Sequence, residues 1–243
     1  MDLTSTYVST AEPQRTRKIV VLISGSGKPP NIQSSSFGFT KPSTGSNLQA
    51  LIDACVSSRI PSAKIAFVLS NRSAAYGLQR AAQASPPIPT AVLAFKTYVN
   101  ARAREGVEAT REDYDAAVAE RIQKEVPDAD LVVLAGWMHI LSEKFLDLMT
   151  MPVINLHPAL PGAFDGAHAI ERAYTAFQKG EVGHTGVMVH RVVKEVDRGE
   201  PILTRVVEIK KEDSIADLEA RIHEVEHDLI VEATIKVLQE GSV

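Results

Sequence analysis

The strongest constraint on the fold is an alternation of short apolar runs with segments of helical periodicity. The first apolar run, KIVVLI at residues 18–23, is continuous, which is typical of a strand buried on both faces. Further strands are predicted at residues 65–69, 90–95, 131–135 and 153–156, and helices at residues 47–56, 73–83, 111–125 and 168–179. Strands separated by helices predict a mostly parallel sheet with crossover helices.

The last third of the chain has a different pattern. Residues 186–193 and 201–209 are predicted to pair as antiparallel strands, and residues 214–238 to form a long last helix. The predicted fold class is therefore α/β and Rossmann-like, with a mostly parallel twisted sheet flanked by helices, an antiparallel C-terminal strand pair and a long last helix.

The chain is expected to form one domain, residues 18–243, preceded by a flexible tail, residues 1–17. Residues 27–44 are rich in Pro, Gly and Ser and separate the first strand from its helix. Such junctions usually take about 2–6 residues, so this stretch is interpreted as a loop insertion.

Composition excludes several classes of function. The chain is 44% hydrophobic and 23% charged, which is ordinary for a globular protein. A net charge of −4 gives no bulk electrostatic reason to bind nucleic acid or an acidic membrane. The sequence shows no apolar run long enough to span a bilayer and no signal peptide. Cys55 is the only cysteine, so no internal disulfide can form, and a reducing, cytoplasmic location is expected.

Three polar or glycine-rich clusters follow predicted strands. They begin at Ser24 after the first strand, at Gly136 after the fourth and at Asn155 in the fifth. In open α/β sheets ligands bind at the carboxyl ends of the strands, so these clusters are expected to converge.

The run Gly45-Ser46-Asn47 lies just before a predicted helix. Ser46 or Asn47 could simply be the helix N-cap. The same position leaves backbone N–H groups free at the positive end of the helix dipole, which is suited to a phosphate. Both interpretations remain open on spacing alone.

Asn155 and His157 are the candidate catalytic pair. Alternate residues of a strand point to one side, so both are expected on the same face. An amide N–H can stabilise a developing oxyanion, and an imidazole can move a proton near neutral pH. A carboxylate such as Asp197 would raise the pKa of His157 if it lay beside it, but their spacing does not show this. The alternative is that both residues only form hydrogen bonds at a strand end.

The run from His223 to His227 matches H-E-x-x-H, a zinc-protease motif. A catalytic zinc needs a third protein ligand, and the sequence offers no suitable continuation. No metal site is expected, and this stretch is interpreted as a solvated or substrate-facing helix edge.

Several motifs together resemble the folate-dependent formyltransferases. Asn155-Leu156-His157-Pro158-Ala159-Leu160 resembles their N-[IL]-H-P-[SA]-L signature, and residues 134–141 resemble their L-A-G-[FW]-M-x-I-L segment. Residues 185–190 and 195–202 are similar to T-G-x-x-V-H and D-x-G-x-[PI]-I. Residues 20–24 with 45–48 are similar to V-L-I-S-G-x-G-S-N-L. The resemblance extends from about residue 18 to 238.

The resemblance implies an enzyme of purine biosynthesis. It would transfer the formyl group of 10-formyltetrahydrofolate, the co-substrate, to the amine of glycinamide ribonucleotide, without a metal. Asn155 would polarise the formyl group, His157 would transfer a proton, and Asp197 would position His157 and keep it charged. The implied ribonucleotide contacts are Gly45, Ser46, Asn47 and Glu226. The implied folate contacts are Arg111, Met138, His139, Ile140, Leu141, Asn155, Val193 and Asp197.

The sequence departs from the family pattern at the insertion, at Leu160-Pro161-Gly162, and at His139, where some relatives have arginine. The first departure affects the phosphate contacts, and the third affects those to the folate side chain. The principal alternative is a formyltetrahydrofolate deformylase, a hydrolase with the same three residues. A tRNA-directed formyltransferase and a non-catalytic nucleotide-binding module fit less well. Partners are expected to be small molecules, with the protein a monomer or a homodimer.

Overall fold

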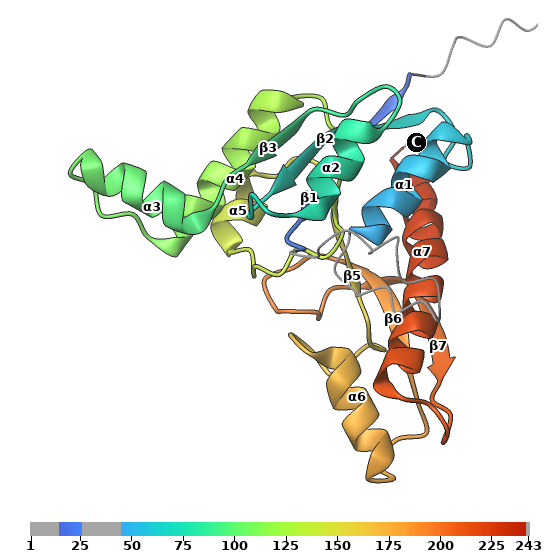
Figure 1. Cartoon of the computed structure of the whole chain (residues 1–243). Coiled ribbons are helices and arrows are strands. Elements are labelled where there is room, and N and C mark those ends of the chain that lie inside the picture. The colour runs from blue at the N-terminus through green and yellow to red at the C-terminus, as the bar shows by residue number, and fades with distance from the viewer. Residues whose placement is uncertain (1–14, 26–44, 242–243) are drawn as a thin grey trace, which may run out of the picture.

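The computed structural model describes residues 15–25 and 45–241. Within them, seven strands form one sheet in the order β3-β2-β1-β4-β5-β6-β7, with helices on both faces (Figure 1). This arrangement confirms the predicted fold class. Most of the predicted tail and the whole insertion, residues 27–44, lie outside the described residues.

The first five strands are parallel. They are β1 (Arg17–Ile23), β2 (Ala63–Ser70), β3 (Thr90–Val92), β4 (Leu131–Leu134) and β5 (Val153–His157). The strand β1 lies between β2 and β4, so the order reverses at β1. In a sheet of this kind the crevice at such a reversal is where ligands bind.

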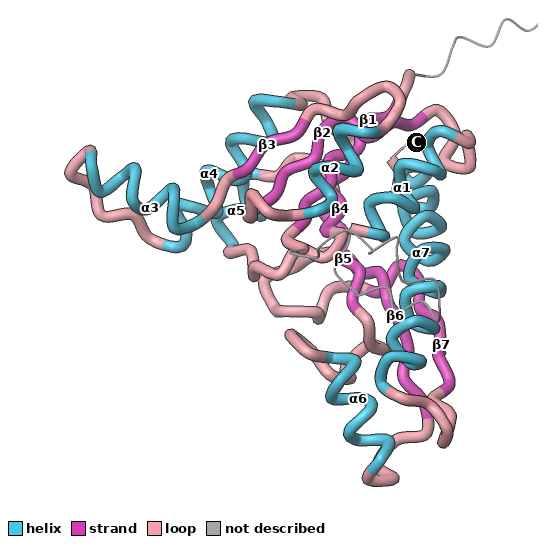
Figure 2. The backbone as a smooth tube through the Cα atoms, in the orientation of Figure 1, coloured by secondary structure: helices cyan, strands magenta, loops and turns pink. Residues whose placement is uncertain are grey.

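The sheet is completed by two antiparallel strands. The strand β6 (His184–Arg191) pairs with β7 (Pro201–Glu208), as the sequence predicts, and it also pairs with β5. The strands β5, β6 and β7 lie side by side (Figure 2), so the turn between β6 and β7 lies beside β5 although it is far from it in the sequence.

Two hydrophobic cores lie on opposite faces of the sheet. In β1, Ile19 and Val21 face one core while Val20 and Leu22 face the other, and all four are fully buried. The first core is covered by α1 (Ser46–Val56), α2 (Tyr76–Gln83), α6 (Ala169–Gln178) and α7 (Ile215–Glu240), and the second by α4 (Arg111–Glu125) and α5 (Glu143–Leu148). The continuous apolar run of β1 thus reflects burial on both sides.

Two helices begin with reciprocal side-chain caps. At α4, the side chain of Thr110 accepts from the N–H of Asp113, whose carboxylate accepts from the N–H of Thr110. Ser214 and Asp217 form the same arrangement at α7. These caps satisfy N–H groups that the first turn of a helix leaves unpaired.

One prediction of local structure was wrong, and two helices were not predicted. The strand expected at residues 90–95 ends at Val92, and Phe95 begins a further helix, α3 (Phe95–Arg104). The helix α5 was not predicted either. A short apolar run fits a strand or a helix equally well, and α3 has no buried residue that would strengthen a helical pattern. This helix projects from the body of the molecule (Figure 1).

No helix among the described residues is long and apolar enough to cross a membrane.

Candidate active site

The loops after β1 and β4 meet at the carboxyl edge of the sheet. The backbone N–H of Ser24 donates to the carbonyl of Gly136 at 3.1 Å, and the N–H of Met138 donates to Ser24 Oγ at 2.9 Å. These two bonds join the first and second of the predicted polar clusters, as the parallel strand order requires.

The structure brings Asn155, His157 and Asp197 together. Asn155 Nδ2 donates to Asp197 Oδ1 at 3.3 Å, and His157 Nδ1 lies 3.4 Å from Asp197 Oδ2. Both β5 residues thus face the same carboxylate, although Asp197 comes from the turn after β6. His157 is buried in the structure.

His190 is a fourth member of this cluster that the sequence did not single out. It is the cross-strand partner of Asn155 in the β5–β6 pair. Its Nε2 lies 3.2 Å from Asn155 Nδ2 and 3.4 Å from Asp197 Oδ1. His190 ends the T-G-V-M-V-H run, so the signal was present, but its role depends on strand register.

The loop after β5 encloses His157 and Asp197. The carbonyl of Phe164 lies 3.2 Å from His157 Nε2, and the N–H of Gly166 donates to Asp197 Oδ2 at 2.8 Å. Arg198, next to Asp197, pairs with Asp165 at 2.6 Å. These contacts were not predictable from a motif, because they form through the backbone or between side chains far apart in the sequence.

The turn that carries Asp197 has an unusual backbone. Asp197 has a φ of 56°, a left-handed conformation that Asp tolerates better than most residues. A Cβ at Gly199 would lie 1.6 Å from the carbonyl oxygen of Arg191, so only glycine lets the turn approach β6 this closely. Such strained positions often occur at functional sites.

Burial and hydrogen bonding act in opposite directions on Asp197. Burial raises the pKa of its carboxyl, but donors from His190 and from the Gly166 backbone outweigh burial, so the pKa is lowered overall. Asp197 is therefore a carboxylate at neutral pH.

The charge state of His157 differs from the expectation. Burial lowers the pKa of His157, and the opposing effects of Asp197 and of the Phe164 carbonyl do not restore it. The 3.4 Å contact to Asp197 is longer than a charge-assisted hydrogen bond of about 2.7–2.9 Å. The imidazole is thus neutral at neutral pH, because desolvation exceeds the attraction of a carboxylate that it shares with other donors.

The predicted phosphate loop at the start of α1 contacts the last helix, α7. Gly45 is the N-cap of α1, with a left-handed φ of 69°, so the cap is neither Ser46 nor Asn47. Asn47 Nδ2 donates to Glu226 Oε2 at 3.0 Å, and Asn47 Oδ1 is buried without a hydrogen-bond partner among the described residues. A Cβ at Gly45 would lie 2.9 Å from Gly77 Cα, which requires glycine here.

Glu226 is only 5% exposed, and burial raises its pKa to about 7, with Asn47 acting in the opposite direction. The H-E-x-x-H run, residues 223–227, does not form a metal site within the part of the chain that the structure describes. Burial and the neighbouring His227 lower the pKa of His223 to about 4. No three His, Cys, Asp or Glu side chains of the described residues are placed to hold a metal.

Four of the predicted folate residues, at positions 138–141, lie in the loop between β4 and α5, and Arg111 at the start of α4 contacts this loop. Arg111 Nη2 donates to the carbonyl of Ile140 at 3.0 Å, and its Nε donates toward His139 Nε2 at 3.0 Å. Met138 and Ile140 are 68% and 59% exposed, whereas Leu141 is buried in the second core beneath them. Two exposed apolar side chains beside a guanidinium suit a ligand with an aromatic ring and an anionic end.

Val193 lies in the turn after β6 and is also partly exposed. The next residue, Lys194, pairs with Glu143 at the start of α5 at 2.8 Å. This ion pair connects the turn that carries Asp197 to the end of the 138–142 loop.

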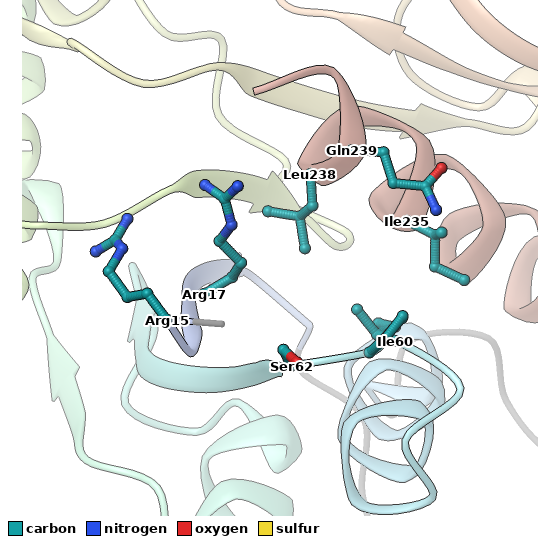
Figure 3. A pocket seen from close by; sticks show the side chains of 8 residues that line it. Arg15, Arg17, Ile60, Ser62, Ile235, Leu238 and Gln239 are labelled. Carbon is teal, nitrogen blue, oxygen red and sulfur yellow. The ribbon is translucent and has the colours of Figure 1, made fainter. Parts of the chain in front are cut away.

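Two hollows lie outside this cluster. An open groove of about 520 Å³ lies along α1 and α7, with Ser46 and His227 among its lining residues. A smaller pocket of about 140 Å³ lies near the amino end of β1, where Arg15 and Arg17 face Ile60 and Leu238 (Figure 3). Both arginines pair with Asp130, and Arg15 Nη1 also lies 3.6 Å from Asp128 Oδ2.

Comparison with known proteins identifies relatives of this site and fold. Residues 39–234 match the family described as formyl transferase. The phosphoribosylglycinamide formyltransferase of Schizosaccharomyces pombe is 46% identical over 227 residues, which cover 92% of this chain and 98% of that protein. The protein of the same name from Saccharomyces cerevisiae is 42% identical over 231 residues, covering 92% and 98%. A crystal structure of glycinamide ribonucleotide transformylase 1 from Symbiobacterium toebii superposes with a TM-score of 0.75 at 32% identity, covering 94% of this chain and 90% of that chain.

Proposed function

Because the chain belongs to the formyl transferase family, we propose that it transfers a formyl group from 10-formyltetrahydrofolate to the amine of glycinamide ribonucleotide. The products are formylglycinamide ribonucleotide and tetrahydrofolate, in the synthesis of purines. The observation that carries this proposal is the meeting of Asn155, His157 and Asp197 at the carboxyl edge of the sheet.

The three residues divide the work of acyl transfer. Asn155 Nδ2 is a preformed donor for the oxyanion that develops on the formyl carbon. His157, neutral at the start, accepts the proton of the attacking amine and returns it to the departing folate nitrogen. Asp197 stabilises the imidazolium that exists between these steps and holds the orientation of the ring.

His190 and Gly166 support this arrangement through Asp197. Each faces one oxygen of the carboxylate, so the carboxylate cannot rotate away from His157. Much of the remaining rate enhancement comes from holding both substrates against this cluster.

The two substrates occupy opposite sides of the cluster. Gly45, Ser46 and Asn47 bind the phosphate at the start of α1, and Glu226 contacts the ribonucleotide beside Asn47. Met138, Ile140, Leu141 and Val193 line the pterin site, with Asn155 and Asp197 at its inner end. Arg111 and His139 lie nearer the anionic end of the folate.

The match to relatives named phosphoribosylglycinamide formyltransferase, which covers 93–98% of those proteins, favours this reaction over the hydrolytic deformylase. Residues 18–243 are proposed to act as one domain on small molecules, as a monomer or homodimer in the cytoplasm.

The proposal is tested by following folate release from 10-formyltetrahydrofolate with and without glycinamide ribonucleotide. Wild type should release folate only with the ribonucleotide, and His157→Ala should lose on the order of 10²–10⁴-fold in rate. Release without the ribonucleotide would instead identify a deformylase. Tight binding of a folate analogue without any release would identify a binding module.

A further inference from the structure

Asp115 is a buried carboxylate that no step of the proposed reaction uses. It lies in α4 and is fully buried. A charge in such a position is costly unless it is hydrogen-bonded. Its two oxygens have different partners: Oδ2 accepts from the backbone N–H of Ser142 at 2.8 Å, and Oδ1 lies 2.7 Å from His139 Nε2.

These contacts connect α4 to two points of the 138–142 loop, which lines the proposed donor site. Ser142 closes this loop at the start of α5, and His139 lies within it. Aromatic rings also surround His139, with the Tyr114 ring at 5.1 Å and the Trp137 ring at 6.1 Å between centroids. The ring of His139 is thus held on several sides, and Asp115 is the carboxylate bound to it.

His139 Nε2 faces two groups with opposite requirements. Arg111 Nε can only donate to it, and the carboxylate of Asp115 can only accept from it. A nitrogen 2.7 Å from a buried carboxylate satisfies that charge best when it carries the proton. Arg111 is then held by the Asp115 charge and by the carbonyl of Ile140 rather than by the imidazole lone pair.

We propose that Asp115 is a positioning residue for the formyl donor, which fixes the 138–142 loop and keeps the proton of His139 on Nε2. This inference rests on the proposed function, because it assumes that this loop binds the folate. Because His139 then donates its Nε2 proton to Asp115, the Arg111 guanidinium stays oriented along the loop and toward the ligand.

Asp115→Asn separates the two roles. The N–H of Ser142 needs an acceptor, so the Asn oxygen turns toward Ser142 and the loop stays anchored. The Asn Nδ2 then faces His139 and donates to Nε2, which moves the imidazole proton to Nδ1. Arg111 would lose the attraction of the Asp115 charge and keep the carbonyl of Ile140, so its guanidinium would be held less firmly along the loop.

Long-range ¹H–¹⁵N spectra of histidine-labelled protein report this directly, with the His139 signals assigned by their loss in His139→Gln. Wild type should carry the proton on Nε2 and Asp115→Asn on Nδ1. The KM for 10-formyltetrahydrofolate should rise on the order of tenfold, while the KM for glycinamide ribonucleotide stays unchanged. Glu112→Gln, which removes an exposed charge one turn earlier in α4, is the matched control and should change neither.

A proton on Nδ1 in wild type would overturn the inference, and that measurement does not depend on the folding of any variant. An unchanged tautomer in folded Asp115→Asn, or an equal rise in both KM values, would also overturn it. The proposed function is tested separately by formyl transfer in wild type. An active wild type with an unaffected Asp115→Asn would refute only the positioning role.

Discussion

Two carboxyl groups of the site, those of Asp197 and Glu226, are buried with opposite results. Asp197 has donors on both oxygens, and its pKa is lowered despite burial. Glu226 has one neutral donor, Asn47, and burial raises its pKa to about 7. The number of donors therefore decides whether a carboxyl of this site is charged at neutral pH.

Glu226→Gln should increase stability in alkaline solution. The folded protein binds the Glu226 proton more tightly than the unfolded chain, whose glutamate has a pKa near 4.5. The free energy of unfolding of wild type therefore falls as pH rises from about 4.5 to about 7, and it stays lower above that range. Gln removes this loss, roughly 3 kcal/mol at most for a shift of this size.

Chemical denaturation at pH 5 and pH 8 measures the effect. The variant should exceed wild type at pH 8 and match it at pH 5. Glu224→Gln, at an exposed position of the same helix, is the control and should show no pH-dependent gain. A Glu226→Gln protein that is equally affected at both pH values would contradict the prediction.

At the level of residues, the sequence was sufficient to predict that Asn155 and His157 lie on one face, but it did not predict which residues surround them. The spacing of two in a strand placed both on one face, and the structure confirms that they face one carboxylate. Asp197 could be named only through the family resemblance, and His190 only through the register of β6 on β5. The neutral state of His157 depends on burial, which a motif does not report.

Among the elements, the turn between β6 and β7 leaves little room for a change of backbone or side chain. It carries Asp197 in a left-handed conformation and passes so close to Arg191 that Gly199 has no room for a side chain. The turn is also tied to α5 through Lys194 and to the loop after β5 through Arg198.

Gly199→Ala should displace this turn and move Asp197 away from His157. A displacement of about 1 Å costs on the order of 10²-fold in rate, so we expect a loss of that order in kcat/KM. Steady-state formyl transfer measures it. Gly183→Ala, near the start of β6, has open space for the added methyl group and should keep full activity. Normal activity in Gly199→Ala would show that the turn is not held as tightly as the structure indicates.

Elements were predictable where their apolar pattern faced a core. The buried strands β1, β4 and β5 and the amphipathic helix α4 lie where the sequence placed them. The exposed α3 and the six-residue α5 were missed, because neither presents a long apolar stripe.

At the scale of the whole molecule, α7 connects the proposed ribonucleotide site to the proposed donor site. It packs on α1, where Glu226 meets Asn47, and on β6 and β7, which precede and follow the Asp197 turn. At its far end Glu240 pairs with Arg191 at 2.6 Å. The fully buried side chains of α7 therefore support both sides of the site.

Leu229→Ala should destabilise the protein by about 2–5 kcal/mol, because it removes a fully buried side chain and leaves a cavity. Thermal and urea-induced unfolding measure the change. Val206→Ala, at an exposed position of β7, is the comparison and should cost much less. Similar losses in the two variants would show that α7 is not packed as the structure describes.

The position of β1 between β2 and β4 also bears on how the chain reaches its native state. The β6–β7 hairpin forms by closing the chain over residues 192–200, whereas pairing of β1 with β4 must close it over residues 24–130. Contacts between such distant segments slow folding. We expect the hairpin with Asp197 to form early and the central pair to form late. During synthesis, Asn155 and His157 would leave the ribosome before their carboxylate partner, so a nascent chain gains its reactive centre only after most of its length has emerged.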